Sequence, residues 1–183
     1  PKDSALAKGT VEMKYMTAKE EDILTNQNYI QKGTVIDKLL KSLIVDKDVD
    51  YNSLLTGDKN AIMVVARVLA YGKNYEFNYR GKDEIVDLST IDNKPLLKEV
   101  EDKAGDNNFE FVLPATDNKI TFKLLSHSDE LNIERELQGL KKMNKESDPS
   151  GTTRLKHMIT SVNGLTEMKD IREFVDNYLL ASD

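Results

Sequence analysis

The hydrophobic periodicity of this chain changes twice along its length, and this change limits the folds that are open to it. Between residues 75 and 125, four short segments alternate apolar and polar side chains with the period of two that is typical of half-buried strands. On either side, apolar residues recur at the spacing of amphipathic helices. The sequence therefore predicts an α+β fold, with a mainly helical body and an inserted small antiparallel β lobe.

The alternating segments are separated by turn residues such as Arg80-Gly81-Lys82 and Thr116-Asp117-Asn118. We expect them to form a single four-stranded antiparallel lobe, with an exposed loop over 94–108. A further alternating segment, Val11–Tyr15, predicts an edge strand. The segments predicted as strands of the lobe are Tyr75–Tyr79, Glu84–Leu88, Phe109–Leu113 and Ile120–Leu124.

These patterns divide the chain into three parts. Residues 1–73 are expected to hold an N-terminal strand and a helical core, and residues 74–126 the antiparallel β lobe. Residues 127–183 are expected to form C-terminal helices that pack with the N-terminal helices. Within this last part a solvated linker over 145–151 precedes a helix that is expected to continue to Val162.

Short-range signals mark where helices begin and end. Thr17 and Glu20 have the spacing of a capping box, in which the hydroxyl and the carboxylate each satisfy a free backbone N–H at a helix start. Gly72 follows the apolar segment 61–70 and suits the position just after a helix end. That segment is apolar on every face, which predicts a central helix with neighbours on several sides.

Arg67 is the one charged residue inside the apolar segment 61–70. A guanidinium in such a place needs a carboxylate or carbonyl partner, because desolvation of an unpaired charge is costly. We therefore expect Arg67 to be substantially buried and paired with an acidic neighbour or with backbone carbonyls.

The composition excludes several classes of site and partner. No cysteine is present, which rules out a disulfide framework, a Cys-ligated zinc site, an iron–sulfur cluster and a thiol nucleophile. A net charge of −6 gives no general attraction for nucleic acid or anionic lipid. The longest apolar run is far shorter than the ~20 residues that span a bilayer, and Pro1–Ser4 lacks the pattern of a secretory signal. We expect no nucleic-acid or membrane partner.

Residues with catalytic potential are few and scattered. The two histidines, His127 and His157, lie in different predicted elements, and we expect both to face solvent. Glu20, Glu21 and Asp22 are adjacent carboxylates that leave open a metal-dependent hydrolase, although the helix dipole also favours acidic residues in a first turn. We predict that the protein is not an enzyme and has no catalytic, cofactor-binding or metal-binding residue, and no cofactor.

The C-terminal segment carries a continuous apolar stripe, on a helix that we expect to reach Asp183 because no Gly or Pro stops it. Such a stripe usually packs on its own domain. The alternative is a helix-in-groove contact with a partner or another copy of this chain, with Ile171, Phe174 and Tyr178 as binding residues. The stripe consists of Ile171, Phe174, Val175, Tyr178 and Leu179.

Several segments, taken in their order and spacing, resemble one protein family over nearly the whole chain, although no single motif is specific. The segments are Met16–Leu24, Gly33–Leu40, Leu54–Ile62, Arg67–Tyr75, Phe111–Pro114, Lys123–Leu125, Thr152–Leu155, Ser161–Gly164 and Phe174–Asn177. In this combination the chain resembles the T-even-type phage baseplate hub family of small tail proteins.

The resemblance implies a non-catalytic structural component of the baseplate hub of a contractile phage tail, which binds other tail proteins in the virion or in the host cytoplasm during assembly. A second hypothesis is a hub assembly chaperone that leaves before the virion is finished. Some family members carry a CPxC-like cysteine pair where this chain has Asn78–Lys82, so we expect aromatic packing alone to hold the β lobe. The family pattern runs past both ends of this sequence, and we expect Pro1 and Asp183 to be limits of order rather than termini.

Overall fold

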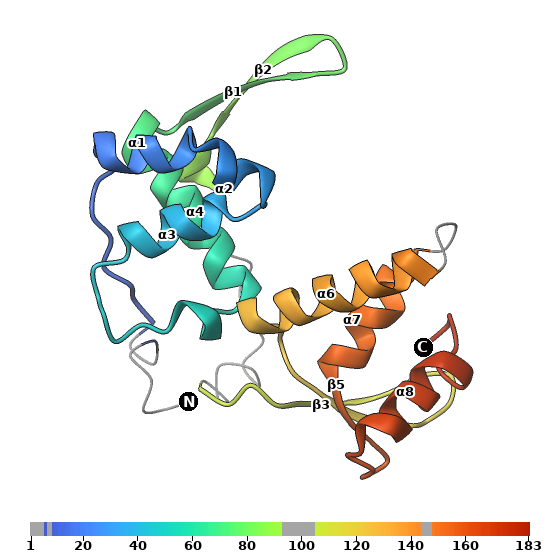
Figure 1. The fold of residues 1–183 in the computed structure, drawn as a ribbon. Coiled ribbons are helices and arrows are strands. Elements are labelled where there is room, and N and C mark those ends of the chain that lie inside the picture. Colours follow the sequence, from blue (N-terminus) through green and yellow to red (C-terminus); the bar gives the residue numbers. More distant parts are fainter. Residues whose placement is uncertain (1–5, 7–8, 93–104, 144–147) are drawn as a thin grey trace. The chain divides into compact units, whose positions relative to one another are not determined.

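A computed structural model of the chain describes residues 6, 9–92, 105–143 and 148–183. It confirms the α+β class, because the described residues form helices together with two small antiparallel sheets (Figure 1). The predicted loop over 94–108 and the predicted linker over 145–151 fall partly outside the described residues, and Pro1–Ser4 falls wholly outside them.

The chain divides into two compact units. The first comprises Pro1–Tyr51 and Gly57–Lys103, and the second comprises Asn52–Thr56 and Ala104–Asp183. The first unit contains α1 (Ala18–Leu24), α2 (Gln27–Gln31), α3 (Val35–Leu43), all but the first residue of α4 (Thr56–Tyr71), β1 (Asn74–Tyr79) and β2 (Lys82–Asp87). The second contains β3 (Phe109–Val112), β4 (Lys119–Phe122), α6 (His127–Met143), α7 (Ser150–Met158), β5 (Ile159–Val162) and α8 (Met168–Asn177).

The buried side chains of the first unit come mainly from α3 and α4. Leu40 and Leu43 are fully buried, as the helical spacing of α3 predicts, and Ile62 and Ala66 are the buried residues of α4. Helix α1 begins with the predicted capping box of Thr17 and Glu20, and the Thr17 N–H donates to Glu20 Oε2 over 3.0 Å.

Glu20 is also completely buried, which the capping pattern alone does not predict. Its Oε1 accepts hydrogen bonds from Lys14 Nζ at 2.8 Å and from Ser42 Oγ at 2.7 Å. Its Oε2 accepts from the Thr17 hydroxyl at 2.6 Å. This carboxylate therefore fastens α3 and the segment before α1 to the first turn of α1.

The predicted edge strand over Val11–Tyr15 is wrong. Only Met13 forms a β-bridge, with Ile44, and the Lys14 N–H donates to the Leu43 carbonyl over 2.9 Å. The segment does not form a strand, because it pairs with the residues that follow α3 at a single β-bridge.

The strands between residues 75 and 125 form parts of two separate sheets, so the predicted single four-stranded lobe is wrong. β1 pairs only with β2, whereas β3 and β4 belong to a sheet of order β3-β4-β5. β5 lies where the sequence predicts the end of a helix, because α7 stops at Met158 and the next four residues form a strand that pairs with β4 across a register shift. The predicted packing of the helices over 127–183 on the N-terminal helices stays a prediction.

The second unit is built around this three-stranded sheet and α8. Leu113, Ile120 and Ile159 contribute from the β-sheet side, and Ile171, Phe174 and Val175 contribute from α8 to the same buried cluster. The predicted continuation of the last helix to Asp183 is wrong, because α8 ends at Asn177. The Asp183 carboxylate instead accepts hydrogen bonds from the backbone N–H groups of Ala115 and Thr116, at 2.9 and 3.2 Å.

Both histidines lie in the second unit. The expectation that both face solvent is wrong. His127, the first residue of α6, is 4% exposed. His157 Nε2 lies 3.0 Å from Glu136 Oε2, and Arg172 holds the same carboxylate in a two-pronged contact of 2.6 and 2.8 Å. Hydrogen bonding from Arg172 is the main reason that the pKa of Glu136 falls to about 2. One carboxylate on α6 therefore joins α7 and α8.

Thr153 on α7 is 1% exposed, and its hydroxyl has no hydrogen-bond partner within the described parts of the chain. We expect Thr153→Val to raise the free energy of unfolding by about 1 kcal/mol, because valine keeps the shape and removes an unsatisfied polar group. The melting temperature should rise by about 2–4 °C. Thr152→Val is the matched control, because the Thr152 hydroxyl donates to the Pro149 carbonyl. Equal melting temperatures for the Thr153 variant and the unsubstituted chain would contradict this prediction.

Candidate protein-interaction surface

The hairpin β1–β2 is a two-stranded sheet that extends away from the helices of the first unit (Figure 1). Its tight turn consists of Arg80 and Gly81, whose φ angles of 53° and 80° both lie in the left-handed region. Two consecutive residues with positive φ are typical of the type I′ hairpin turn, which suits the twist of the strands. The Gly81 N–H also donates to Asn78 Oδ1 at 3.0 Å, which helps to fix the turn.

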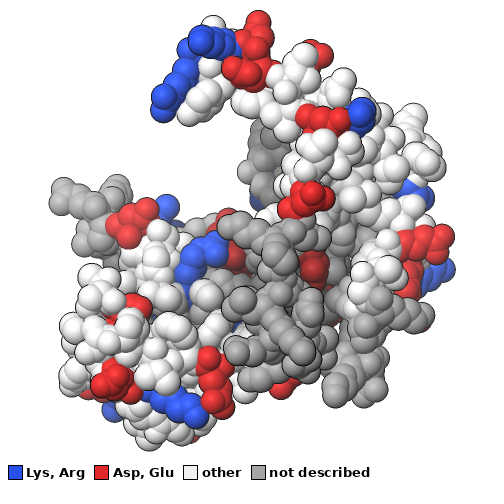
Figure 2. Space-filling model, turned by 180° about the vertical axis from the view of Figure 1, so that it is seen from behind, with Lys and Arg blue, Asp and Glu red and all other residues white. Residues whose placement is uncertain are grey.

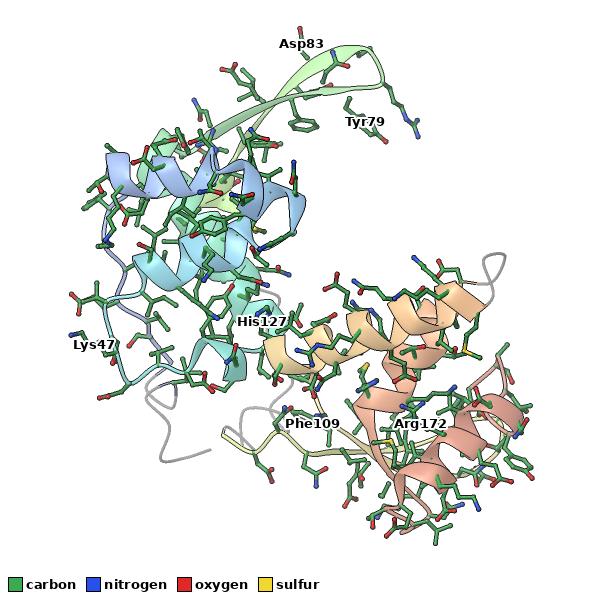
Figure 3. The ribbon with its side chains drawn as sticks, in the orientation of Figure 1. Lys47, Tyr79, Asp83, Phe109, His127 and Arg172 are labelled. Carbon is green, nitrogen blue, oxygen red and sulfur yellow. The ribbon has the colours of Figure 1, made fainter. Side chains whose placement is uncertain are left out.

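The register of the hairpin gathers the three aromatic side chains of β1 on one face. Tyr75, Phe77 and Tyr79 alternate along β1 and pair with Val86, Glu84 and Lys82, so all six side chains share one face. Asp83 pairs with Asn78 and therefore belongs to the opposite face; Figure 3 shows Tyr79 and Asp83 on opposite sides of the ribbon. The rings of Tyr75 and Phe77 contact each other with their centroids 5.8 Å apart. We call this side the aromatic face.

The side chains of the aromatic face are exposed within the described residues, although the guanidinium of Arg67 lies over the Tyr75 ring and that of Arg80 lies over the Tyr79 ring. Every residue of β1 is exposed, and so is every residue of β2 except Asp87. Tyr79 retains 55% of its accessible surface. A two-stranded hairpin is marginally stable in water unless an apolar face packs against something else. This face is therefore a candidate binding surface for another protein.

An apolar groove of about 410 Å³ lies in the same unit and shares Tyr75 with the aromatic face. We call it the α4 groove, because α4 contributes more of its lining residues than any other element. One of its lining residues, Arg67, is charged. The lining residues are Met16, Leu24, Ile36, Leu39, Leu40, Met63, Val64, Ala66, Arg67, Tyr71, Tyr75 and Leu88.

Arg67 is half-buried rather than substantially buried, so the prediction for its environment is only partly right. Its Nη1 donates to the Gly72 carbonyl over 3.1 Å, and a backbone carbonyl is one of the two expected partners. Its guanidinium lies over the rings of Tyr71 and Tyr75, with 4.9 and 5.7 Å to their centroids. Gly72 ends α4 with φ of 81°, as predicted. The expected acidic partner is absent among the described residues, because the neighbours of Arg67 are aromatic rings.

The adjacent carboxylates Glu20, Glu21 and Asp22 occupy three different environments. Glu20 is buried with hydrogen bonds to both of its oxygens. Glu21 accepts a hydrogen bond from the Tyr71 hydroxyl, which raises the pKa of that tyrosine. Asp22 is exposed. Among the residues that the structure describes, no three His, Asp or Glu side chains are grouped as a metal ion would need.

The proposed C-terminal binding residues also separate. Ile171 and Phe174 are 2% and 7% exposed and belong to the buried cluster of the second unit, so the core alternative applies to them. Tyr178 directly follows α8 and is 59% exposed. Of the three residues, only Tyr178 is exposed, because the helix ends before it.

Charges of both signs are interspersed over the face of the molecule that Figure 2 shows. Many of them form pairs across neighbouring elements, such as Lys73 with Asp87 at 2.7 Å in the first unit and Arg154 with Glu130 at 2.6 Å in the second. In the described part of the chain, no helix is both long enough and apolar enough to span a membrane.

Comparisons with protein-family models, with curated proteins and with solved structures give no match for this chain. Its candidate site therefore stands on its own geometry. The sequence does not identify the aromatic face as a binding surface, because the alternation of Tyr75, Phe77 and Tyr79 predicts the inner side of a four-stranded lobe. The second predicted strand ends at Leu88 and the third begins at Phe109. This long separation is the signal that could have indicated two sheets and an open face on the first hairpin.

Proposed function

We propose that this protein is a non-catalytic structural component of the baseplate hub of a contractile phage tail, and that it acts by binding other tail proteins. The observation that carries the proposal is the aromatic face of the β1–β2 hairpin, which is exposed within the described residues. Clustered exposed aromatic side chains are typical of protein-binding surfaces. The class of partner comes from the resemblance of the chain to the T-even-type baseplate hub family.

The backbone of the hairpin supports the same proposal. Each of its strands pairs with only the other, so each has one outer edge whose N–H and C=O groups lack a neighbouring strand among the described residues. Such edges accept a further strand from a partner, with main-chain hydrogen bonds for affinity and side-chain contacts for specificity. The partner is another hub protein or another copy of this chain.

A hub assembly chaperone is the second candidate, since the same surface would serve a transient complex. The two candidates differ in where the protein is found after assembly. We expect quantitative mass spectrometry of purified virions to detect this chain at a fixed ratio to the other hub proteins. Its presence in tail-assembly intermediates together with its absence from virions would identify it as a chaperone. Its absence from both would contradict the proposed function.

We expect Phe77→Ser to weaken co-purification with hub proteins by about tenfold, because a central aromatic side chain contributes on the order of 1–2 kcal/mol or more to an interface. Ile85→Ser is the matched control, because Ile85 lies on the opposite face of the hairpin and is 64% exposed. Both variants should keep the circular dichroism spectrum of the unsubstituted protein. Equal retention of hub proteins by Phe77→Ser and the unsubstituted chain would show that the aromatic face is not the contact.

A further inference from the structure

The α4 groove has a wall of regularly spaced side chains. Met63, Arg67 and Tyr71 are four residues apart on α4 and therefore form one line along the helix, about 12 Å long. Met63 and Tyr71 are 41% and 51% exposed, and Arg67 is half-buried between them. This line is a partly exposed ridge with an apolar residue, a cation and an aromatic residue in sequence.

The opposite side of the groove is purely apolar. Met16 precedes α1, Leu24 ends α1 and Ile36 lies near the start of α3, and all three line the groove. Arg67 is therefore the one charge in an otherwise uncharged lining. A ligand that only buried apolar surface would leave this guanidinium desolvated and unpaired, which is unfavourable. The groove thus selects a ligand with both apolar groups and a negative charge.

The hydrogen-bonding capacity of Arg67 is mostly unused within the described residues. A guanidinium has five N–H donors, and one of them reaches the Gly72 carbonyl. Arg67 takes part in no ion pair in the described part of the chain, and its guanidinium carbon lies over the rings of Tyr71 and Tyr75, 4.9 and 5.7 Å from their centroids. Aromatic rings on a guanidinium hold it in place and leave its edge free for a two-pronged contact with a carboxylate.

The walls of the groove favour a helical ligand over an extended one. An extended peptide binds by pairing its backbone with an open strand edge, but most of the lining residues come from α1, α3 and α4. Helices have no open backbone edge along their length, so they offer side-chain packing alone. Ridges of side chains on one helix pack into the grooves between helices of another.

We propose that the α4 groove binds an amphipathic helix of a partner protein, whose apolar side chains fill the groove and whose Asp or Glu side chain pairs with Arg67. This inference rests on the proposed function, because it names the kind of partner segment that a protein-binding hub component takes up. It assigns to Arg67 a recognition role in addition to its hydrogen bond to the Gly72 carbonyl and its contacts with the rings of Tyr71 and Tyr75.

A displayed peptide library tests the proposal even though the partner protein is unidentified. The probe is a yeast-displayed library of 16-residue helical peptides, with apolar residues varied at positions i, i+3, i+4 and i+7 and with one neighbouring position fully randomised. The full-length protein is the bait. We expect the selected peptides to carry apolar residues along one face and to carry Asp or Glu at the randomised position.

Three variants then locate the binding site on the protein. Arg67→Gln should weaken the selected peptides by about tenfold, because it removes the charge from the pair. Met63→Glu should weaken them by at least as much, because it places a like charge on the exposed ridge next to the ligand carboxylate. Arg80→Gln is the matched control, since Arg80 lies at the tip of the hairpin and does not line the groove. All three should keep the circular dichroism spectrum of the unsubstituted protein.

Three results would overturn the inference. These are a failure to enrich any helical peptide, a preference for Lys or Arg at the randomised position, and selected peptides that bind Arg67→Gln as tightly as the unsubstituted protein. Each of these leaves the virion measurement and the Phe77→Ser experiment unaffected, because they do not involve Arg67. Conversely, absence of the protein from virions would not change the peptide result, so the two failures are distinguishable.

Discussion

Replacing Glu20 by glutamine is expected to lower the free energy of unfolding of the first unit by about 2–4 kcal/mol. The side chain is fully buried, and its two oxygens accept four hydrogen bonds, from Lys14, Ser42 and both donors of Thr17. Glutamine keeps the shape but replaces one oxygen by an NH₂ group, which faces donors and cannot accept from them. The loss of stability is smaller than for an ion pair in which both groups are fully buried. The Lys14 side chain is 43% exposed, so its ammonium group can be hydrated when the carboxylate is removed.

Chemical unfolding followed by circular dichroism measures this effect. Asp22→Asn is the matched control, because it makes the same carboxylate-to-amide change in the same helix on an exposed residue. We expect the control to alter the free energy of unfolding by less than about 0.5 kcal/mol. A loss of the same small size for Glu20→Gln would contradict the structural role that we assign to the buried carboxylate.

The stabilising effect of Glu20 should depend on pH in a defined direction. The hydrogen bond from Lys14 is the largest of the effects that hold the pKa of the Glu20 carboxyl well below its ordinary value of 4.5, against the opposite effect of burial. A carboxyl with a lowered pKa in the folded state contributes its full stabilisation above the unfolded pKa and loses it as the pH falls through the folded pKa. The difference in stability between the unsubstituted protein and Glu20→Gln should therefore be constant above pH 5 or so and narrow below about pH 4. A difference that widened on acidification would contradict the prediction.

The features that the sequence predicts correctly depend on residues a few positions apart. The capping box of Thr17 and Glu20 requires a spacing of three, and the end of α4 at Gly72 requires one residue that adopts positive φ at low cost. The turn at Arg80 and Gly81 is equally local. In each case the backbone groups to be satisfied and the side chains that satisfy them lie within one turn of chain, so the pattern is complete in the sequence.

Strand β5 shows why other elements escape prediction. Its four residues, Ile159–Val162, follow a helical stretch and are too few to establish a period of their own. They form a strand because β4 lies beside them, with Ile120 opposite Val162 and Thr121 opposite Ser161. The hydroxyls of Thr121 and Ser161 lie 2.6 Å apart across this pair. A partner some forty residues away decides the conformation, and hydrophobic periodicity does not report partners at that separation.

Helix α4 shows why the sequence alone does not identify the candidate site. Its apolar residues point in all directions, which predicts neighbours on all sides, but only Ile62 and Ala66 are buried. The periodicity indicates correctly that every face of the helix favours an apolar contact. It does not indicate whether the contact comes from the same chain. The same reasoning applies to Arg67, for which the sequence predicts a charged partner and the described residues supply a carbonyl and two aromatic rings.

Substitutions in the apolar stripe of α8 are expected to have large effects on the free energy of unfolding at core positions and small effects at surface positions. Phe174→Ala should lower the free energy of unfolding of the second unit by about 3–5 kcal/mol, because it removes a ring from the buried cluster and leaves a cavity between α8 and the sheet. Tyr178→Ala should change it by less than about 0.5 kcal/mol, because that side chain is largely in water. The two residues follow the same helical stripe in the sequence, so each serves as the matched control for the other in chemical unfolding experiments.

The difference expected between Phe174→Ala and Tyr178→Ala depends on where α8 ends. The helix ends at Asn177, and the chain then turns so that the Asp183 carboxylate reaches the backbone N–H groups of Ala115 and Thr116. Had the helix continued, Tyr178 would lie one turn along the face that carries Ile171 and Phe174 and would share their burial. A large loss of stability for Tyr178→Ala would therefore show that the helix runs further than Asn177 in solution. A negligible loss for Phe174→Ala would show that the stripe is not the core of the second unit, and the contact of α8 with the sheet would then be refuted.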